Sequence, residues 1–210
     1  MIHRFTDSAV GANAYLVWDE QSLEGFVLDL CVPPQTVRAY AEERGITVNY
    51  LILSHGHYDH AYYAEDYPPL FPGVPLYCHE NETAILSDPA ANVSALIGQP
   101  TVYPLPDKTL AEGDTVTLGT QQWQVFHTPG HTPGCICLYN EAEKRMLTGD
   151  TLFADGGFGR FDFKYGDRAA LGVSLHRLLT MDGDIAIYPG HGRASFIRDE
   201  RHTLGYFERY

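Results

Sequence analysis

The chain has 210 residues, of which 44% are hydrophobic and 20% are charged. This balance supplies enough apolar residues for a core and argues against disorder, and the length favours a single domain over residues 1–210. The net charge of −13 disfavours nucleic acids and anionic lipids as partners, because both are bound by basic surfaces.

Signals for export or membrane insertion are missing from the sequence. The first five residues lack the apolar centre of a signal peptide, and no apolar run is long enough to span a bilayer. The cysteines have neither zinc-finger nor CxxC spacing, so we expect buried thiols in a reducing compartment; they are Cys31, Cys78, Cys135 and Cys137. These observations predict a cytoplasmic protein without a membrane partner.

The first half of the chain alternates short apolar runs with helical stretches. A helix is expected over 34–44, because Pro34 suits the first helical turn and Gly45 suits a helix end. Shorter helices are expected over 58–66 and 80–86, and strands over 2–6, 14–18, 25–28, 49–53 and 74–78.

The second half of the chain is richer in strands. It is preceded by a proline-punctuated segment, 88–107, which we expect to be a loop or short-helix segment that could line a site. Leucines at helical spacing predict a helix over 168–179. Strands are expected over 115–118, 122–127, 135–139, 145–147 and 185–188. The pattern alone indicates one domain of mixed α and β structure.

The densest group of ligand-type residues follows the strand at 49–53, in the stretch Ser-His-Gly-His-Tyr-Asp-His. Imidazole nitrogens and carboxylate oxygens are the ligands that suit zinc or iron. His55 and His57 can point one way, and Asp59 and His60, which lie beyond the turn, can point another. The cluster therefore has enough ligands for two neighbouring metal ions.

Three later Gly-rich turns each carry one more ligand-type residue after a strand-like run. They are the turns of His131, Asp150 and His191. A histidine-rich polar turn without a metal is the alternative, but these downstream partners disfavour it. The remaining histidines are interpreted as packing, capping or surface residues, including His79 and His127.

These motifs resemble the signature of the metallo-β-lactamase superfamily, HxHxDH followed by His, Asp and His at strand ends, from about Ala12 to Gly192. The resemblance implies an α+β fold, a four-layer αββα sandwich. It also implies two divalent metal ions, with zinc expected first and iron or manganese as alternatives. One ion would be bound by His55, His57 and His131, and the other by Asp59, His60 and His191, with Asp150 bridging the two.

The same resemblance implies the chemistry of the site. A hydroxide shared by the two ions would attack a carbonyl or phosphoryl centre, and Asp59 and Asp150 are the expected catalytic carboxylates. Asp29 would fix the turn of the first metal-binding loop. Asp150 disfavours antibiotic hydrolysis, because several zinc β-lactamases carry Cys there. His57 and the lack of a flavin domain disfavour a flavodiiron protein, and the acidic charge disfavours RNA processing.

Within the superfamily, the stretch 153–163 resembles the G-[RK]-x-x-F segment of glyoxalase II and of persulfide dioxygenases. By this resemblance Arg160 would contact the carboxylate of a glutathione moiety, whereas the alternative is a structural pair with Asp162 or Asp155. The chain departs from full-length glyoxalase II, because it ends about 20 residues after His191 without a further helical domain.

We therefore predict a metal-dependent hydrolase of S-acyl thioesters of the S-lactoylglutathione type, with a small-molecule acyl-thiol as its substrate. One alternative is an iron-dependent persulfide dioxygenase, which would use His55, His131 and Asp150 as a two-histidine, one-carboxylate set. Another is a hydrolase of a different small ester or thioester. A purely structural metal site is disfavoured, because such sites are closed and four-coordinate.

Overall fold

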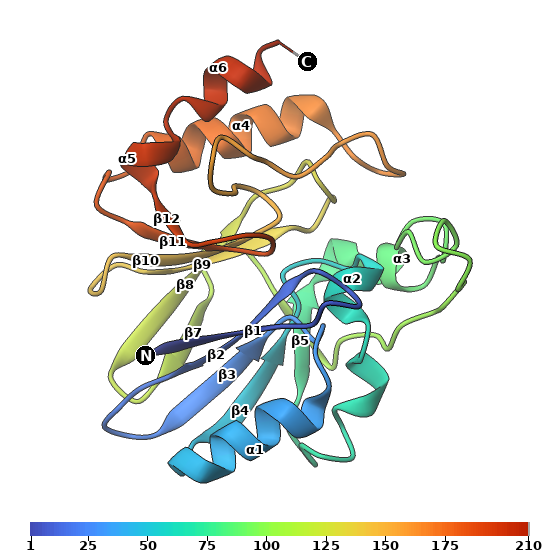
Figure 1. Cartoon of the computed structure of the whole chain (residues 1–210), viewed down its shortest axis with the longest axis vertical. Coiled ribbons are helices and arrows are strands. Elements are labelled where there is room, and N and C mark those ends of the chain that lie inside the picture. The colour runs from blue at the N-terminus through green and yellow to red at the C-terminus, as the bar shows by residue number, and fades with distance from the viewer. Residues whose placement is uncertain (210) are drawn as a thin grey trace.

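Two β-sheets face each other, and helices cover their outer sides in the computed structural model (Figure 1). The structure describes residues 1–209, and over these residues each sheet has six strands. The predicted α+β, four-layer αββα architecture is confirmed.

The first sheet is built from the N-terminal part of the chain. Its first three strands pair antiparallel, and the remaining pairs are parallel. Helix α1 (Pro34–Arg44) connects β3 to β4, with proline in its first turn and Gly45 in the left-handed conformation at its end. In order across the sheet, the strands are β1 (Ile2–Thr6), β2 (Asn13–Trp18), β3 (Glu24–Leu28), β4 (Thr47–Ile52), β5 (Leu76–His79) and β6 (Lys108–Leu110).

The second sheet comes from the rest of the chain. Only β10 and β11 pair in parallel, and helix α4 (Arg168–Leu179) lies in the connection between them. Helices α5 (Ile197–Glu200) and α6 (Thr203–Phe207) cover the same outer face as α4 (Figure 1). In order across the sheet, the strands are β12 (Ser195–Phe196), β11 (Ala186–Pro189), β10 (Arg145–Gly149), β9 (Ile136–Asn140), β8 (Gln121–His127) and β7 (Thr115–Leu118).

Three buried apolar clusters occupy the three spaces between the four layers. The cluster between the sheets contains the fully buried Trp123, whose ring meets Phe26 of the opposite sheet edge to face at 5.7 Å. The cluster under α4 contains Leu171 and Leu175, two of the leucines that predicted that helix. Burial of apolar surface on both faces of each sheet explains the nearly continuous apolar runs in the central strands.

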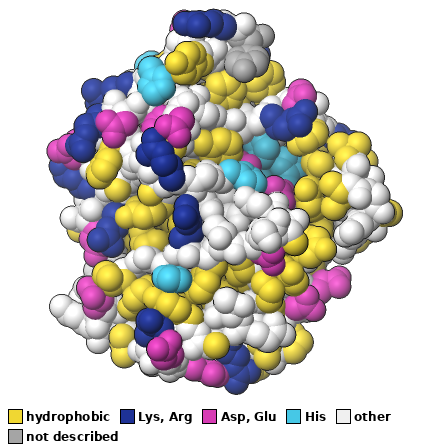
Figure 2. All heavy atoms as spheres, viewed as in Figure 1, with side chains coloured by type: hydrophobic (Ala, Val, Ile, Leu, Met, Phe, Trp, Pro, Cys, Tyr) yellow, Lys and Arg dark blue, Asp and Glu magenta, His cyan; other side chains and the backbone are white. Residues whose placement is uncertain are grey.

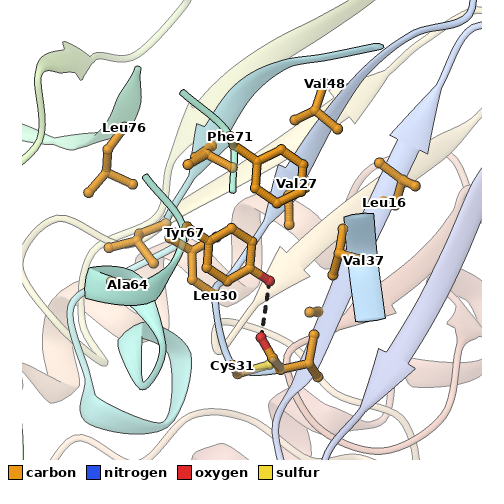
Figure 3. Packing of buried hydrophobic residues seen from close by; sticks show 14 of the residues in the cluster. Leu16, Val27, Leu30, Cys31, Val37, Val48, Ala64, Tyr67, Phe71 and Leu76 are labelled. Carbon is orange, nitrogen blue, oxygen red and sulfur yellow. Dashed lines mark hydrogen bonds between the residues drawn. The ribbon is translucent and has the colours of Figure 1, made fainter. Parts of the chain in front are cut away.

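The outer cluster of the first sheet packs α1 and the segment before β5 against the strands (Figure 3). Tyr67 stacks on Phe71 with 5.5 Å between ring centroids, and its buried hydroxyl donates a hydrogen bond to the carbonyl of Val32 at 3.2 Å. That bond satisfies the polar end of an otherwise apolar side chain.

The helix expected over 58–66 is shorter in the structure. It divides into α2 (Tyr58–Ala61) and a 3₁₀ turn, η1 (Ala64–Asp66). The His60 carbonyl accepts a hydrogen bond from the Leu30 amide at 2.7 Å, and the Tyr63 amide donates to the Leu30 carbonyl. A continuous helix would use these groups internally, so pairing with the loop after β3 ends α2 after one turn.

The other differences from the expected elements are small. The stretch 80–86 begins as a 3₁₀ turn, η2 (Glu80–Glu82), and continues as α3 (Thr83–Leu86). The sequence did not indicate β6 or β12, whose three and two residues are too few to show periodicity. None of the helices within residues 1–209 is long and apolar enough to cross a membrane.

Candidate metal centre

The first metal-binding loop leaves β4 at its carboxyl end and is held from below by Asp29. This carboxylate is 1% exposed and follows β3. One of its oxygens accepts from the Ser54 amide at 2.8 Å, and the other accepts from the Ser54 hydroxyl at 2.9 Å and lies 2.8 Å from His60 Nδ1. Asp29 therefore orients both the turn and one imidazole of the cluster, as the sequence predicts.

A second buried carboxylate, Glu82, joins two of the metal-binding loops. Its side chain has no exposed surface and accepts hydrogen bonds from the Gly56 amide at 2.6 Å, the Gly134 amide at 2.6 Å and the Thr132 hydroxyl at 2.7 Å. Gly56 lies between His55 and His57, and Thr132 follows His131. Burial raises the pKa of Glu82 to about 7, against these three donors.

Glycine is required at both contact points with Glu82. A Cβ atom at Gly134 would lie 2.7 Å from the carboxylate, and one at Gly56 would lie 3.0 Å from it. Sequence reasoning missed this residue. A signal was present, because Glu82 precedes Ile85 and Leu86 by three and four residues and so shares their buried face.

All seven side chains predicted as metal ligands meet at one edge of the sandwich. Ligand atoms lie within 4.8 Å of one another in each of three groups. The oxygens of Asp150 are 3.3 to 3.5 Å from imidazole nitrogens of three different histidines. Asp150 thus lies between the others. The groups are His55, His57 and His131; His55, His60 and Asp150; and Asp59, His60 and His191.

Three buried side-chain atoms of this cluster lack a hydrogen-bond partner among the described residues, as expected of metal ligands. Among the buried side-chain atoms of residues 1–209, His55 Nε2, His57 Nε2 and Asp150 Oδ1 have no hydrogen-bond partner. Burying such atoms unpaired is costly, so their convergence indicates a ligand that the polypeptide does not supply. A divalent cation satisfies nitrogen and carboxylate lone pairs at once.

Hydrogen bonds to backbone carbonyls orient the imidazoles of His131 and His191 toward the cluster. His131 Nδ1 donates to the Arg160 carbonyl at 2.6 Å, and His191 Nδ1 donates to the Gly11 carbonyl at 3.1 Å. Each bond keeps a proton on Nδ1, so Nε2 is the nitrogen that faces the cluster and would bind a cation. Assignment of individual ligands to individual ions stays a prediction.

Burial lowers the pKa of some histidines of the cluster, whereas neighbouring carboxylates raise the pKa of others. Burial lowers the pKa of His55, His131 and His57, the last to about 3, so these rings are neutral and ready to bind a cation. Burial also opposes charge on His191, but hydrogen bonds with Asp150 and Asp59 raise its pKa to about 10.

His60 follows the same pattern as His191. Burial opposes its charged form, and the carboxylates of Asp150, Asp29 and Asp59 outweigh burial and hold its pKa well above the usual value. In the metal-free protein His60 and His191 therefore carry protons that metal binding must release. Burial raises the pKa of Asp150, yet His60 and His191 hold it well below its ordinary value, so this carboxylate is ionised.

Five of the seven cluster residues line the floor of a pocket of about 660 Å³ that opens to the surface; they are His57, Asp59, His131, Asp150 and His191. Figure 2 shows histidine and acidic side chains together at the surface, with hydrophobic side chains directly beside them. Those hydrophobic groups lie over the loop that follows α3 in Figure 1. The apolar lining consists of Tyr58, Val93, Leu96, Ile97, Phe153, Phe158 and Phe163.

Arg160, the predicted substrate contact, lies at the rim of this pocket. Its Nε and Nη2 atoms both donate to the Asp162 carboxylate at 2.7 Å, and its guanidinium lies 3.9 Å above the Phe163 ring. The pairing with Asp162, which was one of the two interpretations of the sequence, is therefore present. The contact with a substrate carboxylate stays a prediction.

The histidines interpreted as packing residues stay outside the cluster. His79 and His127 stack at 4.1 Å, and His79 Nδ1 caps the turn η2 by accepting from the Asn81 amide. His127 Nε2 donates to the Pro133 carbonyl at 2.9 Å. The four cysteines are buried and unpaired, as expected.

Comparison with known proteins agrees with this geometry. The family described as Metallo-beta-lactamase superfamily matches residues 8–191. Probable metallo-hydrolase YqgX of Bacillus subtilis is 31% identical over 91% of this chain and 90% of its own length. Hydroxyacylglutathione hydrolase GloC of Haemophilus influenzae is 31% identical over 93% of this chain and 92% of its own length.

Solved structures share the whole fold. The crystal structure of BLEG-1 B3 metallo-beta-lactamase has a TM-score of 0.88 at 29% identity and covers 99% of both chains. That of TTHA1623 in a di-iron-bound form has a TM-score of 0.83 at 29% identity, over 97% of this chain and 99% of its own. ETHE1 from Myxococcus xanthus has a TM-score of 0.76 at 25% identity, over 98% and 85%. The fold binds two metal ions, iron in one of these structures.

Proposed function

Since the chain belongs to the metallo-β-lactamase superfamily and is a metallo-hydrolase of that superfamily, we propose that it hydrolyses S-acyl thioesters of the S-lactoylglutathione type. The observation that carries the proposal is the convergence of seven residues with nitrogen and oxygen ligand atoms, five of which line an open pocket. Hydroxyacylglutathione hydrolase GloC, similar over nearly the whole chain, supports the thioester as the bond that is cleaved.

The pocket favours attack by water over covalent catalysis. None of its described lining residues is a serine or cysteine, so the usual acyl-carrying nucleophiles are not at hand. Water adds to the carbonyl carbon, the carbon–sulfur bond breaks, and the products are a carboxylic acid and a thiol. A thiol has a pKa near 8.5, so it leaves as a thiolate without a strong general acid.

We assign the metal ions to the predicted ligand sets, His55, His57 and His131 for one and Asp59, His60 and His191 for the other, with Asp150 between them. When bound, two divalent cations would lower the pKa of water and polarise the carbonyl. Zinc is the proposed metal, and iron or manganese are the alternatives. Asp59 is ionised, because His60 and His191 outweigh its burial and lower its pKa, so it can orient water at the pocket floor.

Arg160 is the proposed partner of a carboxylate on the thiol portion of the substrate. For this the guanidinium must exchange Asp162 for the substrate, and both side chains are more than half exposed, so the exchange costs little.

The dioxygenase remains a second candidate because of one observation. The ligand atoms of His55, His60 and Asp150 lie within 4.8 Å of one another, and ETHE1 shares the fold. This two-histidine, one-carboxylate group has His60 where the prediction from the sequence had His131. This chemistry needs a single iron with open positions.

The test is thiol release from S-lactoylglutathione by protein reconstituted with zinc, manganese or iron, together with metal analysis. Asp150→Ala is expected to lower metal content and to reduce kcat/KM by at least about a hundredfold, because losing a group that only hydrogen-bonds to a metal ligand already costs about ten- to a hundredfold. An active, fully loaded variant would contradict the placing of Asp150 between the ions. Oxygen uptake with a glutathione persulfide, without thioester cleavage, would favour the dioxygenase instead.

A further inference from the structure

The pocket above the metal centre has one polar end and one apolar side. The polar end consists of the clustered histidines and carboxylates. On the apolar side, Val93, Leu96 and Ile97 come from the loop after α3, and the last two are 71% and 43% exposed. Large apolar side chains left open to water beside a reactive centre indicate a ligand that covers them.

Two aromatic rings continue this apolar side down to the metal-binding histidines. Phe163 lies 5.7 Å from the ring of His57, and Phe153 lies 5.8 Å from the ring of His191, both edge to face. These two histidines belong to different ligand groups. A chain attached to a carbonyl at the metal centre therefore meets apolar surface at both ends of the cluster.

The loop that carries the three aliphatic residues is built to hold its shape. The buried Asn92 donates from Nδ2 to the Thr101 carbonyl at 2.9 Å and accepts at Oδ1 from the Ser94 amide at 3.0 Å. Its backbone carbonyl accepts from the Tyr58 amide at 2.8 Å, which ties the loop to the first residue of α2 beside the metal ligands.

Val93 adds a sign of functional constraint in the same loop. Its φ is 71°, in the left-handed region that a β-branched residue rarely adopts. Such strain persists only where the surroundings impose it, most often at functional sites. The side chain is 6% exposed and lines the pocket, so the strained backbone places it there.

The described lining residues offer one cation to an anionic thiol. Arg160 is the only lysine or arginine among them, and its Nε and Nη2 atoms already donate to Asp162. Bound cations would offset the charge of Asp59 and Asp150 at the floor, but that position is taken by the thioester carbonyl. The two carboxylates of a glutathione moiety would thus compete with Asp162 for one guanidinium.

We propose that the pocket selects thioesters with an apolar acyl chain of about four to eight carbons, and that Val93, Leu96 and Ile97 bind this chain. The proposal rests on the hydrolase function above and narrows its substrate class. The carbonyl lies at the metal centre, the chain covers the aliphatic side, and the thiol portion needs no charge.

The experiment uses acetyl, butanoyl, hexanoyl and octanoyl thioesters of the neutral thiol N-acetylcysteamine, with S-lactoylglutathione for comparison. We expect kcat/KM to rise about two- to fourfold for each added methylene, mainly through a lower KM, because each buried methylene contributes hydrophobic free energy. The octanoyl thioester should also exceed S-lactoylglutathione in kcat/KM.

Two variants of the loop after α3 test whether Leu96 and Ile97 cause the dependence of kcat/KM on chain length. The double variant Leu96→Ser with Ile97→Ser should reduce the octanoyl-to-acetyl ratio of kcat/KM at least tenfold. Val102→Ser is the matched control, because Val102 is 55% exposed on the same loop but does not line the pocket, and it should keep the ratio. All three residues are exposed, so thermal melting should be unchanged in both variants.

A binding measurement separates this inference from the hydrolase function. The S-octyl thioether of N-acetylcysteamine cannot be hydrolysed, and calorimetry should show that it binds at least tenfold more tightly than the S-ethyl thioether in the parent protein but not in the double variant. Thioester cleavage that is independent of chain length would overturn the inference and leave the hydrolase standing. Absence of cleavage with chain-length-dependent thioether binding would overturn the hydrolase and support the apolar site.

Discussion

Glu82 is a single residue whose replacement we expect to affect both the stability of the protein and its metal site. Both of its oxygens accept backbone amides, one from the loop of His55 and His57 and the other from the loop of His131. A glutamine has one oxygen only, so its amide group would face a backbone N–H of Gly56 or Gly134. The buried donor that remains unpaired costs about 1–3 kcal/mol.

We therefore expect Glu82→Gln to lower the free energy of unfolding by about 1–3 kcal/mol. It should also weaken metal retention against a chelator by about ten- to a hundredfold, because the ligand loops lose their common anchor. Metal analysis after graded chelation, and the visible spectrum of the cobalt(II) form, measure the second effect.

Glu200 provides a matched control for this change. It is 1% exposed and accepts from the Gly156 amide and the Ser195 hydroxyl, so it has the same chemistry as Glu82. Its partners lie six residues after Asp150 and four after His191, whereas two of the three partners of Glu82 are adjacent to predicted ligands. Glu200→Gln should lose a similar stability and keep its metal. Equal metal loss in both variants would show that Glu82 acts only through general stability.

At the scale of elements, β8 supplies the centre of the space between the sheets. Trp123 is fully buried there, while Gln124, the next residue of the strand, is exposed. Trp123→Ala should lower the free energy of unfolding by about 3–5 kcal/mol, since it leaves a large cavity between two sheets. Urea denaturation of the metal-free protein measures the change.

Gln124→Ala serves as the reference on the same strand and should change stability by less than about 0.5 kcal/mol. A small effect of Trp123→Ala would mean that the sheets close over the cavity.

The bounds of the short helices depend on contacts with other parts of the chain. The turn α2 ends where it does because His60 pairs with Leu30, a contact that its own sequence does not encode.

At the scale of the whole molecule, the site joins the two sheets. The loop of His55 to His60 follows β4 of the first sheet, whereas His131, Asp150 and His191 follow strands of the second. Bound cations therefore link the two halves of the sandwich. Metal removal should lower the melting temperature, because a ligand that binds only the folded state stabilises it by about 2.7 kcal/mol at a hundred times its Kd.

This stabilisation should depend on pH. The pKa of His191 is raised to about 10 in the metal-free protein, so its contribution to stability is complete below pH 6.5 and is lost as the pH rises through 10. Metal binding displaces that proton, so the loaded protein lacks this loss. The gap between loaded and metal-free melting temperatures should widen from pH 6.5 to 9.5.

Thermal melts with and without a chelator across this pH range measure the gap. His191→Ala should reduce the pH dependence of the metal-free protein. A gap that stays constant with pH in the parent protein would contradict the protonated state of His191.

The sequence by itself determined the family, the four-layer fold and the residues that meet at the candidate metal centre. The elements and the ligand-type residues follow from local properties, namely apolar runs of strand length, proline and glycine at the ends of α1, and ligand-type residues in turns directly after strands. Such features keep their meaning whichever segments become neighbours. The family and the four-layer fold were implied by the resemblance of these motifs to the superfamily signature, since the pattern alone indicated one domain of mixed α and β structure.

Only the tertiary structure decided how the metal-binding loops are held and what surrounds them. The partners of Glu82 on two loops and the place of Val93, Leu96 and Ile97 beside the metal centre depend on contacts with other parts of the chain. For Arg160, the structure decided between the two interpretations of the sequence by pairing it with Asp162. The spacing of Glu82 from Ile85 and Leu86 indicates that it is buried, but its hydrogen-bond partners are set only by the fold. The strained backbone of Val93 is likewise imposed by its surroundings.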